Sequence, residues 1–85
     1  MTPRQIELAR HALGLRPGTL ISYRNNFVAE PSSPHFDDWV AMEAGGFAAR
    51  RDYTSSLGFV LFHLTRAGAE RALLPGDVLD PEDWK

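Results

Sequence analysis

The sequence predicts a small α+β domain with about three helices and a two-stranded antiparallel hairpin. Its 85 residues are enough for one domain with a limited core. Two strand-like runs at 47–53 and 59–64, of which the second is nearly all apolar, are separated by a short polar turn. Apolar residues recur at helical spacing before the hairpin, and a threonine that can cap a helix follows it.

The first helix is expected at residues 3–13. Thr2 can cap it, Pro3 suits the first helical position, and Gln5 completes a capping box. Gly14 follows the last periodic residue and is suited to the left-handed conformation in which many helices end.

Residues 20–29 are open to two interpretations. Residues 20–23 have the composition of a short strand, whereas Tyr23 and Phe27 have the i, i+4 spacing of a helical turn. We favour an extended segment followed by a helical turn. The proline- and serine-rich residues 30–34 are expected to form a loop.

The second helix is expected at residues 35–46. A serine before Pro34 marks its start, and Asp37 and Asp38 suit the positive end of its dipole. The glycine pair at 45–46 marks its end. Residues 54–58 are the hairpin loop, and Thr65 caps a third helix that residues 75–76 terminate.

Residues 77–85 are an acidic C-terminal tail that follows a single domain at 1–76. The tail also contains the apolar residues Val78, Leu79 and Trp84. This mixture indicates a segment that docks either on its own domain or on a partner, because tryptophan is enriched in interface hot spots.

Charge is segregated along the chain, although the formal net charge is only −2. Residues 1–29 and 47–73 are net basic, whereas residues 30–46 and 74–85 are net acidic. Lys85 is the only lysine, so every internal cation is an arginine, whose planar fork suits phosphate and carboxylate groups.

Cysteine is absent, which excludes a disulfide, a thiolate nucleophile and a cysteine-based zinc site. A small secreted domain usually needs disulfides, so a cytoplasmic setting is expected. The polar N-terminus does not resemble a signal peptide, and no apolar run approaches the roughly 20 residues of a membrane span.

Two segments carry a resemblance to winged-helix (winged helix-turn-helix) regulators. The run M-E-A-G-G-F at 42–47 resembles the end of the recognition helix and the start of the wing. The run F-H-L-T-R-A-G at 62–68, with Leu73 beyond it, resembles the end of the wing and the helix after it. The resemblance covers residues 35–73 and implies a small winged-helix-like domain that binds DNA.

The opening residues and the run Y-R-N-N-F-V at 23–28 are similar to small proteins of phages and prophages. This second likeness implies a phage or prophage origin and no particular activity.

The helix that matches the recognition helix departs from the winged-helix pattern. It carries Asp37, Asp38 and Glu43 and no arginine or lysine. Carboxylates repel the phosphates that supply most non-specific affinity for DNA. DNA contact is therefore expected through the wing and nearby arginines.

The candidate nucleic-acid-binding residues are Arg16, Arg24, Arg50 and Arg51. If they converge, they form a site for nucleic acid or for an acidic protein; if they scatter, they are ordinary solvated charges. Strand alternation sends Arg50 and Arg51 to opposite faces of the hairpin, so only one of them is expected to serve a given surface.

Two function hypotheses follow. The first is a non-enzymatic binding module of phage or prophage type, a small regulator that contacts DNA through the wing and nearby arginines. The second is a protein–protein adaptor or inhibitor, a phage factor that acts on host machinery with its acidic helix and tail. Its candidate residues are Asp37, Asp38, Glu43 and Trp84. The expected partner is thus DNA or a host or phage protein, and a homodimer is compatible with the sequence.

Catalytic and metal chemistry find no support in the sequence. His11, His35 and His63 lack metal-ligand spacing, the serine pairs lack a motif that supplies a base, and no glycine-rich phosphate loop is present. Asp37 and Asp38 are better explained by their place at a helix start than as a catalytic pair. We therefore expect no enzymatic activity, no cofactor and no metal.

Overall fold

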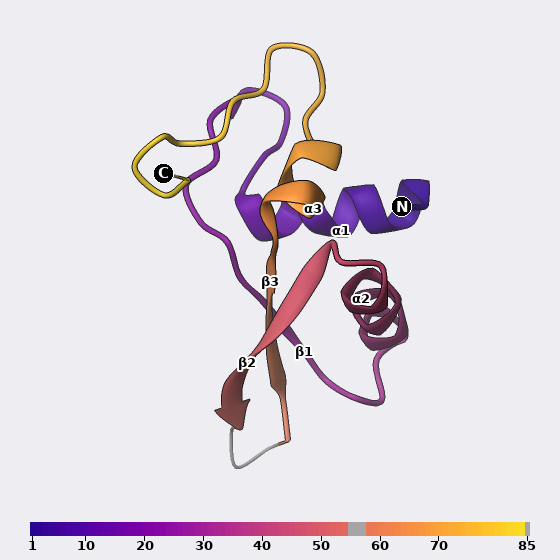
Figure 1. Ribbon diagram of the computed structural model, residues 1–85. Helices are drawn as coiled ribbons and strands as arrows, with labels where there is room; N and C mark the ends of the chain where they lie inside the picture. Colours follow the sequence, from indigo (N-terminus) through magenta and orange to yellow (C-terminus); the bar gives the residue numbers. More distant parts are fainter. Residues whose placement is uncertain (55–57, 85) are drawn as a thin grey trace.

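A computed structural model describes residues 1–54 and 58–84, which form three helices and a three-stranded antiparallel sheet (Figure 1). The elements are, in order, α1 (Pro3–Leu13), β1 (Phe27–Ala29), α2 (Pro34–Ala44), β2 (Ala48–Thr54), β3 (Val60–Leu64) and α3 (Arg66–Arg71). The α+β class that the sequence predicted is confirmed. The sheet has one strand more than the predicted hairpin. Of the hairpin loop predicted at 54–58, residues 55–57 lie outside the described residues.

Helix α1 has the predicted bounds, and its ends have the predicted chemistry. The Thr2 side chain accepts a hydrogen bond from the Gln5 N–H, and the Gln5 side chain accepts one from the Thr2 N–H. Gly14 follows the helix with φ at 79°, and a side chain there would overlap the Tyr23 ring. The glycine therefore ends the helix and makes room for Tyr23 at once.

Strand β1 corrects the prediction for residues 20–29. The strand lies at Phe27–Ala29 rather than at 20–23, and residues 23–28 form no helical turn. Phe27 pairs with Phe62 of β3 and so contributes an aromatic ring to the core. Contacts with β3 outweigh the local i, i+4 pairing on which the helical interpretation rested.

The hairpin of β2 and β3 is confirmed, and β3 occupies the middle of the sheet order β1-β3-β2. Arg50 lies opposite Phe62 and Ala49 opposite His63, and the register shifts between Arg50 and Thr54. Because facing residues of an antiparallel pair share a side of the sheet, Arg50 lies on the core side.

Helix α2 covers the core side of the hairpin (Figure 1). Ser33 caps the helix, and Trp39 and Met42 are its buried residues. The Trp39 ring stacks on Phe62 at 5.6 Å between ring centres and lies 5.1 Å from Phe27. These aromatic contacts join α2 to β3 and β1 in one core.

Helix α3 begins where predicted but is shorter than predicted. The Thr65 side chain accepts a hydrogen bond from the Gly68 N–H, and a Cβ at Gly68 would lie 1.9 Å from the Phe47 carbonyl oxygen. The helix ends at Arg71 instead of near residues 75–76, since the Asp77 carboxylate accepts the Leu74 N–H and holds the chain in a turn.

The C-terminal segment 77–84 docks on the domain beside the loop after α1 (Figure 1). The Val78 N–H donates to the Leu20 carbonyl at 2.7 Å, and the Val78 carbonyl accepts the Ser22 N–H at 3.0 Å. A partly buried ion pair joins Asp77 to Arg10 of α1. Leu79 and Trp84 pack against the core.

Candidate functional site

A hollow of about 420 Å³ brings together candidate residues from both function hypotheses. It lies between the segment 23–26, the outer face of the hairpin and the C-terminal segment. The residues that line it are Tyr23, Arg24, Asn25, Asn26, Arg51, Leu61, Asp83 and Trp84. Two of the four predicted arginines therefore share one site with Trp84.

Two further hollows continue from the first along α1. A small one of about 90 Å³ shares Tyr23 and Arg24 with it and adds Arg16 and His11. A groove of about 620 Å³ in turn shares His11 and Arg16 with the small hollow and follows α1. We call these three hollows, each of which shares lining residues with the next, the arginine path.

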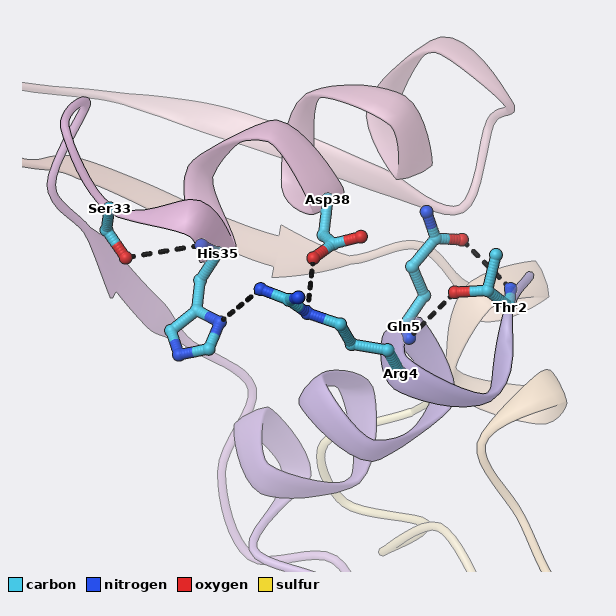
Figure 2. A network of polar contacts seen from close by, with 6 residues as sticks. All are labelled: Thr2, Arg4, Gln5, Ser33, His35 and Asp38. Atoms are coloured by element: carbon cyan, nitrogen blue, oxygen red, sulfur yellow. Dashed lines mark hydrogen bonds and ion pairs between the residues drawn. The ribbon is translucent and has the colours of Figure 1, made fainter.

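The far end of the arginine path lies where α1 meets α2. Figure 2 shows Arg4 reaching from α1 toward the first turn of α2. Its Nε pairs with the Asp38 carboxylate at 2.8 Å, and its Nη2 lies 3.5 Å from His35 Nδ1. The ion pair balances the charge of Arg4, so this end of the path offers less positive charge than the rest.

Positive charge prevails along the path. Its described lining contains Arg4, Arg10, Arg16, Arg24 and Arg51, against the carboxylates Glu7 and Asp83. Arg4 and Arg10 are each ion-paired with an aspartate. Among the side chains that the structure describes, those of residues 1–51 and 58–84, no carboxylate forms an ion pair with Arg16, Arg24 or Arg51. These three guanidinium groups retain charge for a ligand.

Arg24 is held in place without losing its charge. Its Nε and Nη2 donate to the His11 carbonyl at 3.2 and 2.7 Å. Its guanidinium lies 5.3 Å from the centre of the Tyr23 ring. These contacts leave three of its five N–H groups for a ligand.

Arg51 and Arg50 lie on opposite faces of β2, as strand alternation predicted. Arg51 is exposed and lines the hollow, whereas Arg50 donates three hydrogen bonds to the Glu43 carboxylate at 2.9 to 3.2 Å. The Arg50 guanidinium also lies 5.3 Å from the Phe62 ring centre. Arg50 therefore stays apart from the other three arginines and is already neutralised.

The acidic residues of the second hypothesis are not brought together with Trp84. Asp38 is paired with Arg4, and Glu43 is paired with Arg50, whose hydrogen bonds lower the pKa of Glu43. Asp37 is exposed on α2. Trp84 lies in the hollow on the other side of the hairpin.

Asn25 is a structural residue that sequence reasoning missed. Its side-chain amide donates to the Leu64 carbonyl at 3.0 Å and accepts the Leu64 N–H at 2.8 Å. The amide thus continues the pairing of β1 with β3 by one step and fixes Tyr23, Arg24 and Asn26 at the rim of the hollow. No local pattern in the sequence predicts this contact, because the two residues are 39 positions apart.

His63 lies near Arg51, which marks the outer face of the sheet. Burial lowers the pKa of His63, and the charge of Arg51 lowers it further. The imidazole is therefore neutral at physiological pH and adds no charge to the arginine path.

Residues 1–54 and 58–84 contain no group of three or more side chains suited to hold a metal ion. Within those ranges, no helix has the length and apolar character that a membrane crossing requires. No protein-family model, curated protein or solved structure matches this chain.

Proposed function

We propose that this chain is a non-enzymatic binding module that contacts the phosphate backbone of nucleic acid through the arginine path. One observation carries the proposal: Arg16, Arg24 and Arg51 line neighbouring hollows that share Tyr23 and Arg24, and none of the three has a carboxylate partner among the described side chains. Arginine binds phosphate in a bidentate, charge-assisted geometry.

The three arginines come from three separate parts of the chain. Arg16 lies in the turn after α1, Arg24 in the segment before β1, and Arg51 in the hairpin. A single backbone that follows the path passes each in turn. This spacing is the form of a backbone contact, in which charge and position matter and base sequence is not read.

A winged-helix-like regulator of phage or prophage type remains our proposal for the kind of module. The sheet order β1-β3-β2, the hairpin after α2 and the helix capped by Thr65 support it. A helix-turn-helix has two consecutive helices, whereas α2 is the one described helix between β1 and β2. We therefore assign the contact to Arg51 of the wing and its neighbours rather than to α2.

The adaptor hypothesis ranks second. Its support is Asp37, an exposed carboxylate on α2 that forms no ion pair with the described residues. Asp38 and Glu43, however, already have arginine partners within the chain. A pull-down from host lysate that recovers a partner with the wild-type chain, but not with Asp37→Asn, is the expected result of this second function.

Fluorescence anisotropy with labelled random duplex DNA at low salt tests the first function. We expect binding with a dissociation constant of about 1–100 µM and a salt slope of about −3, for three phosphate contacts. The triple variant R16A/R24A/R51A should lose it. The control R50A/R71A removes two charges outside the path and should retain most of the affinity, whereas R24A/R51A, which removes the same charge within the path, should lose it. Absence of binding, or equal loss in the two double variants, contradicts the proposal.

A further inference from the structure

The hollow between Tyr23, Arg51 and Trp84 has features that a contact with duplex backbone does not use. Its volume of about 420 Å³ falls in the range of small-ligand sites, about 300–1,000 Å³. A duplex phosphate needs only surface charge. A hollow with aromatic and amide walls beside two arginines instead suits a whole nucleotide.

We propose that this hollow receives an unpaired base, so that the preferred ligand is single-stranded nucleic acid. The inference rests on the proposed function and specifies its ligand. Tyr23 and Trp84 supply aromatic surface for the base, and Arg24 and Arg51 hold the phosphates on either side. Single-strand binders combine the same two elements, a basic groove and aromatic side chains on which bases stack.

The exposure of these groups fits such a ligand. The Tyr23 side chain is 53% exposed although its backbone N–H is bonded to the Leu13 carbonyl. Asn26 is exposed at the rim, where its amide can both donate to and accept from the edge of a base. Inside a duplex the Watson–Crick edge of a base is paired and both of its faces are stacked, so neither is available to the hollow.

The walls of the hollow are fixed before any ligand arrives. Asn25 ties the segment with Tyr23 to Leu64 through two hydrogen bonds. On the opposite side, the Trp84 carbonyl accepts a hydrogen bond from Arg66 Nη2, and the Trp84 N–H donates to the Asp80 carbonyl at 3.1 Å. A preformed site avoids the entropic cost of ordering loops on binding.

Substitution of Asp83 tests the inference through an expected gain of affinity. It is the one carboxylate among the described residues that line this hollow, and no described arginine forms an ion pair with it. Its charge opposes phosphate beside Arg24 and Arg51. Asp83→Asn should therefore raise the affinity for a single strand, whereas most substitutions in the site lower it.

Titration of the full chain with oligo(dT) and oligo(rU) of about 12 nucleotides, and with a duplex of equal length, tests the inference. We expect a single strand of either sugar to bind at least about tenfold more tightly than the duplex. Emission of Trp84 should change on binding and that of the fully buried Trp39 should not, so Trp84→Phe should abolish the signal.

Substitutions of Tyr23 distinguish a loss of base stacking from a loss of folded structure. Tyr23→Leu should weaken single-strand binding by about fivefold to a hundredfold, while Tyr23→Phe, which keeps the ring, should bind as wild type. Circular dichroism and thermal unfolding check that each variant is folded.

The outcomes distinguish the two proposals. If neither single strand nor duplex binds, the proposed function fails and the inference fails with it. If the duplex binds as tightly as the single strand and Tyr23→Leu changes nothing, the inference is overturned while the proposed function stands.

Discussion

Arg50 and Arg51 are neighbours in sequence, yet they lie in opposite environments. Arg50 lies on the core side of β2, hydrogen-bonded to Glu43 and close to the rings of Phe36 and Phe62. Arg51 lies on the outer side, exposed and without a carboxylate partner in the described chain. The alternation of a strand places one in contact with the core and leaves the other exposed on the outer face.

The same contrast extends to the two sides of the sheet. On the α2 side, Asp38 and Glu43 each meet an arginine, so the acidic helix is largely neutralised within the chain. On the outer side, Arg24 and Arg51 surround a hollow that contains a single described carboxylate. A chain with a net charge of −2 therefore has two arginines beside one hollow that form no ion pair with the described side chains. Net charge alone is a poor guide to partners when opposite charges are separated between faces.

The largest effect on stability is expected at Asn25, because the outer face depends on its two hydrogen bonds to Leu64. Asn25→Ala leaves a backbone donor and a backbone acceptor unpaired in a partly buried place and should lower the free energy of unfolding by about 2 kcal/mol. Urea unfolding measures this value. Asn26→Ala is the matched control and should change it by less than about 0.5 kcal/mol. Equal effects of the two substitutions on the free energy of unfolding would contradict the structural role assigned to Asn25.

A smaller effect is expected at Arg50, whose ion pair with Glu43 is partly exposed to solvent. Arg50→Ala should cost about 1 kcal/mol from the ion pair and the aromatic contacts together, and Arg51→Ala less than about 0.5 kcal/mol. Thermal unfolding of both variants checks the contrast.

The cost of Arg50→Ala should also depend on pH. Arg50 lowers the pKa of Glu43 from its ordinary value of 4.5, so the pair contributes stability above that pH and loses it as the pH falls through the lowered pKa. The difference between wild type and Arg50→Ala should therefore shrink in acid. If the stability difference between wild type and Arg50→Ala stays constant from neutral pH to below the lowered pKa of Glu43, the ion pair contributes nothing and the aromatic contacts account for the whole difference.

The smallest effect is expected at His63, which reports the position of Arg51. Burial and then Arg51 lower the pKa of His63, so its neutral form contributes stability that is lost as the pH falls from about 6.5 through the lowered pKa. In an NMR titration, Arg51→Ala should raise the His63 pKa part of the way toward its ordinary value, and Arg50→Ala should leave it unchanged. The reverse pattern would place Arg50 rather than Arg51 on the outer face.

Local rules predicted most of the elements. The capping box of Thr2 and Gln5, the serine before Pro34 and the cap at Thr65 placed the starts of three helices. The strands of the hairpin paired as predicted, with bounds that differ by a residue. These features depend on neighbouring residues, and neighbouring residues are what a sequence pattern records.

The features that depend on contacts between distant parts of the sequence could not be predicted. The position of β1 depends on β3, and the hollow forms only because Trp84 docks beside Arg24 and Arg51. Strand alternation separated Arg50 from Arg51, but it did not show which of them faces the core. Arg50 faces the core because it lies opposite the buried Phe62 of β3, on the side of the sheet that α2 covers.

The salt dependence of oligonucleotide binding by the two single variants tests the central claim most directly. Arg51→Ala should weaken binding and reduce the magnitude of the slope of log affinity against log salt by about 0.7 for a single strand, or about 0.9 for a duplex. Arg50→Ala should leave both quantities as in wild type. Equal losses in the two variants, or a loss confined to Arg50→Ala, would contradict the division of the hairpin into a structural face and a binding face.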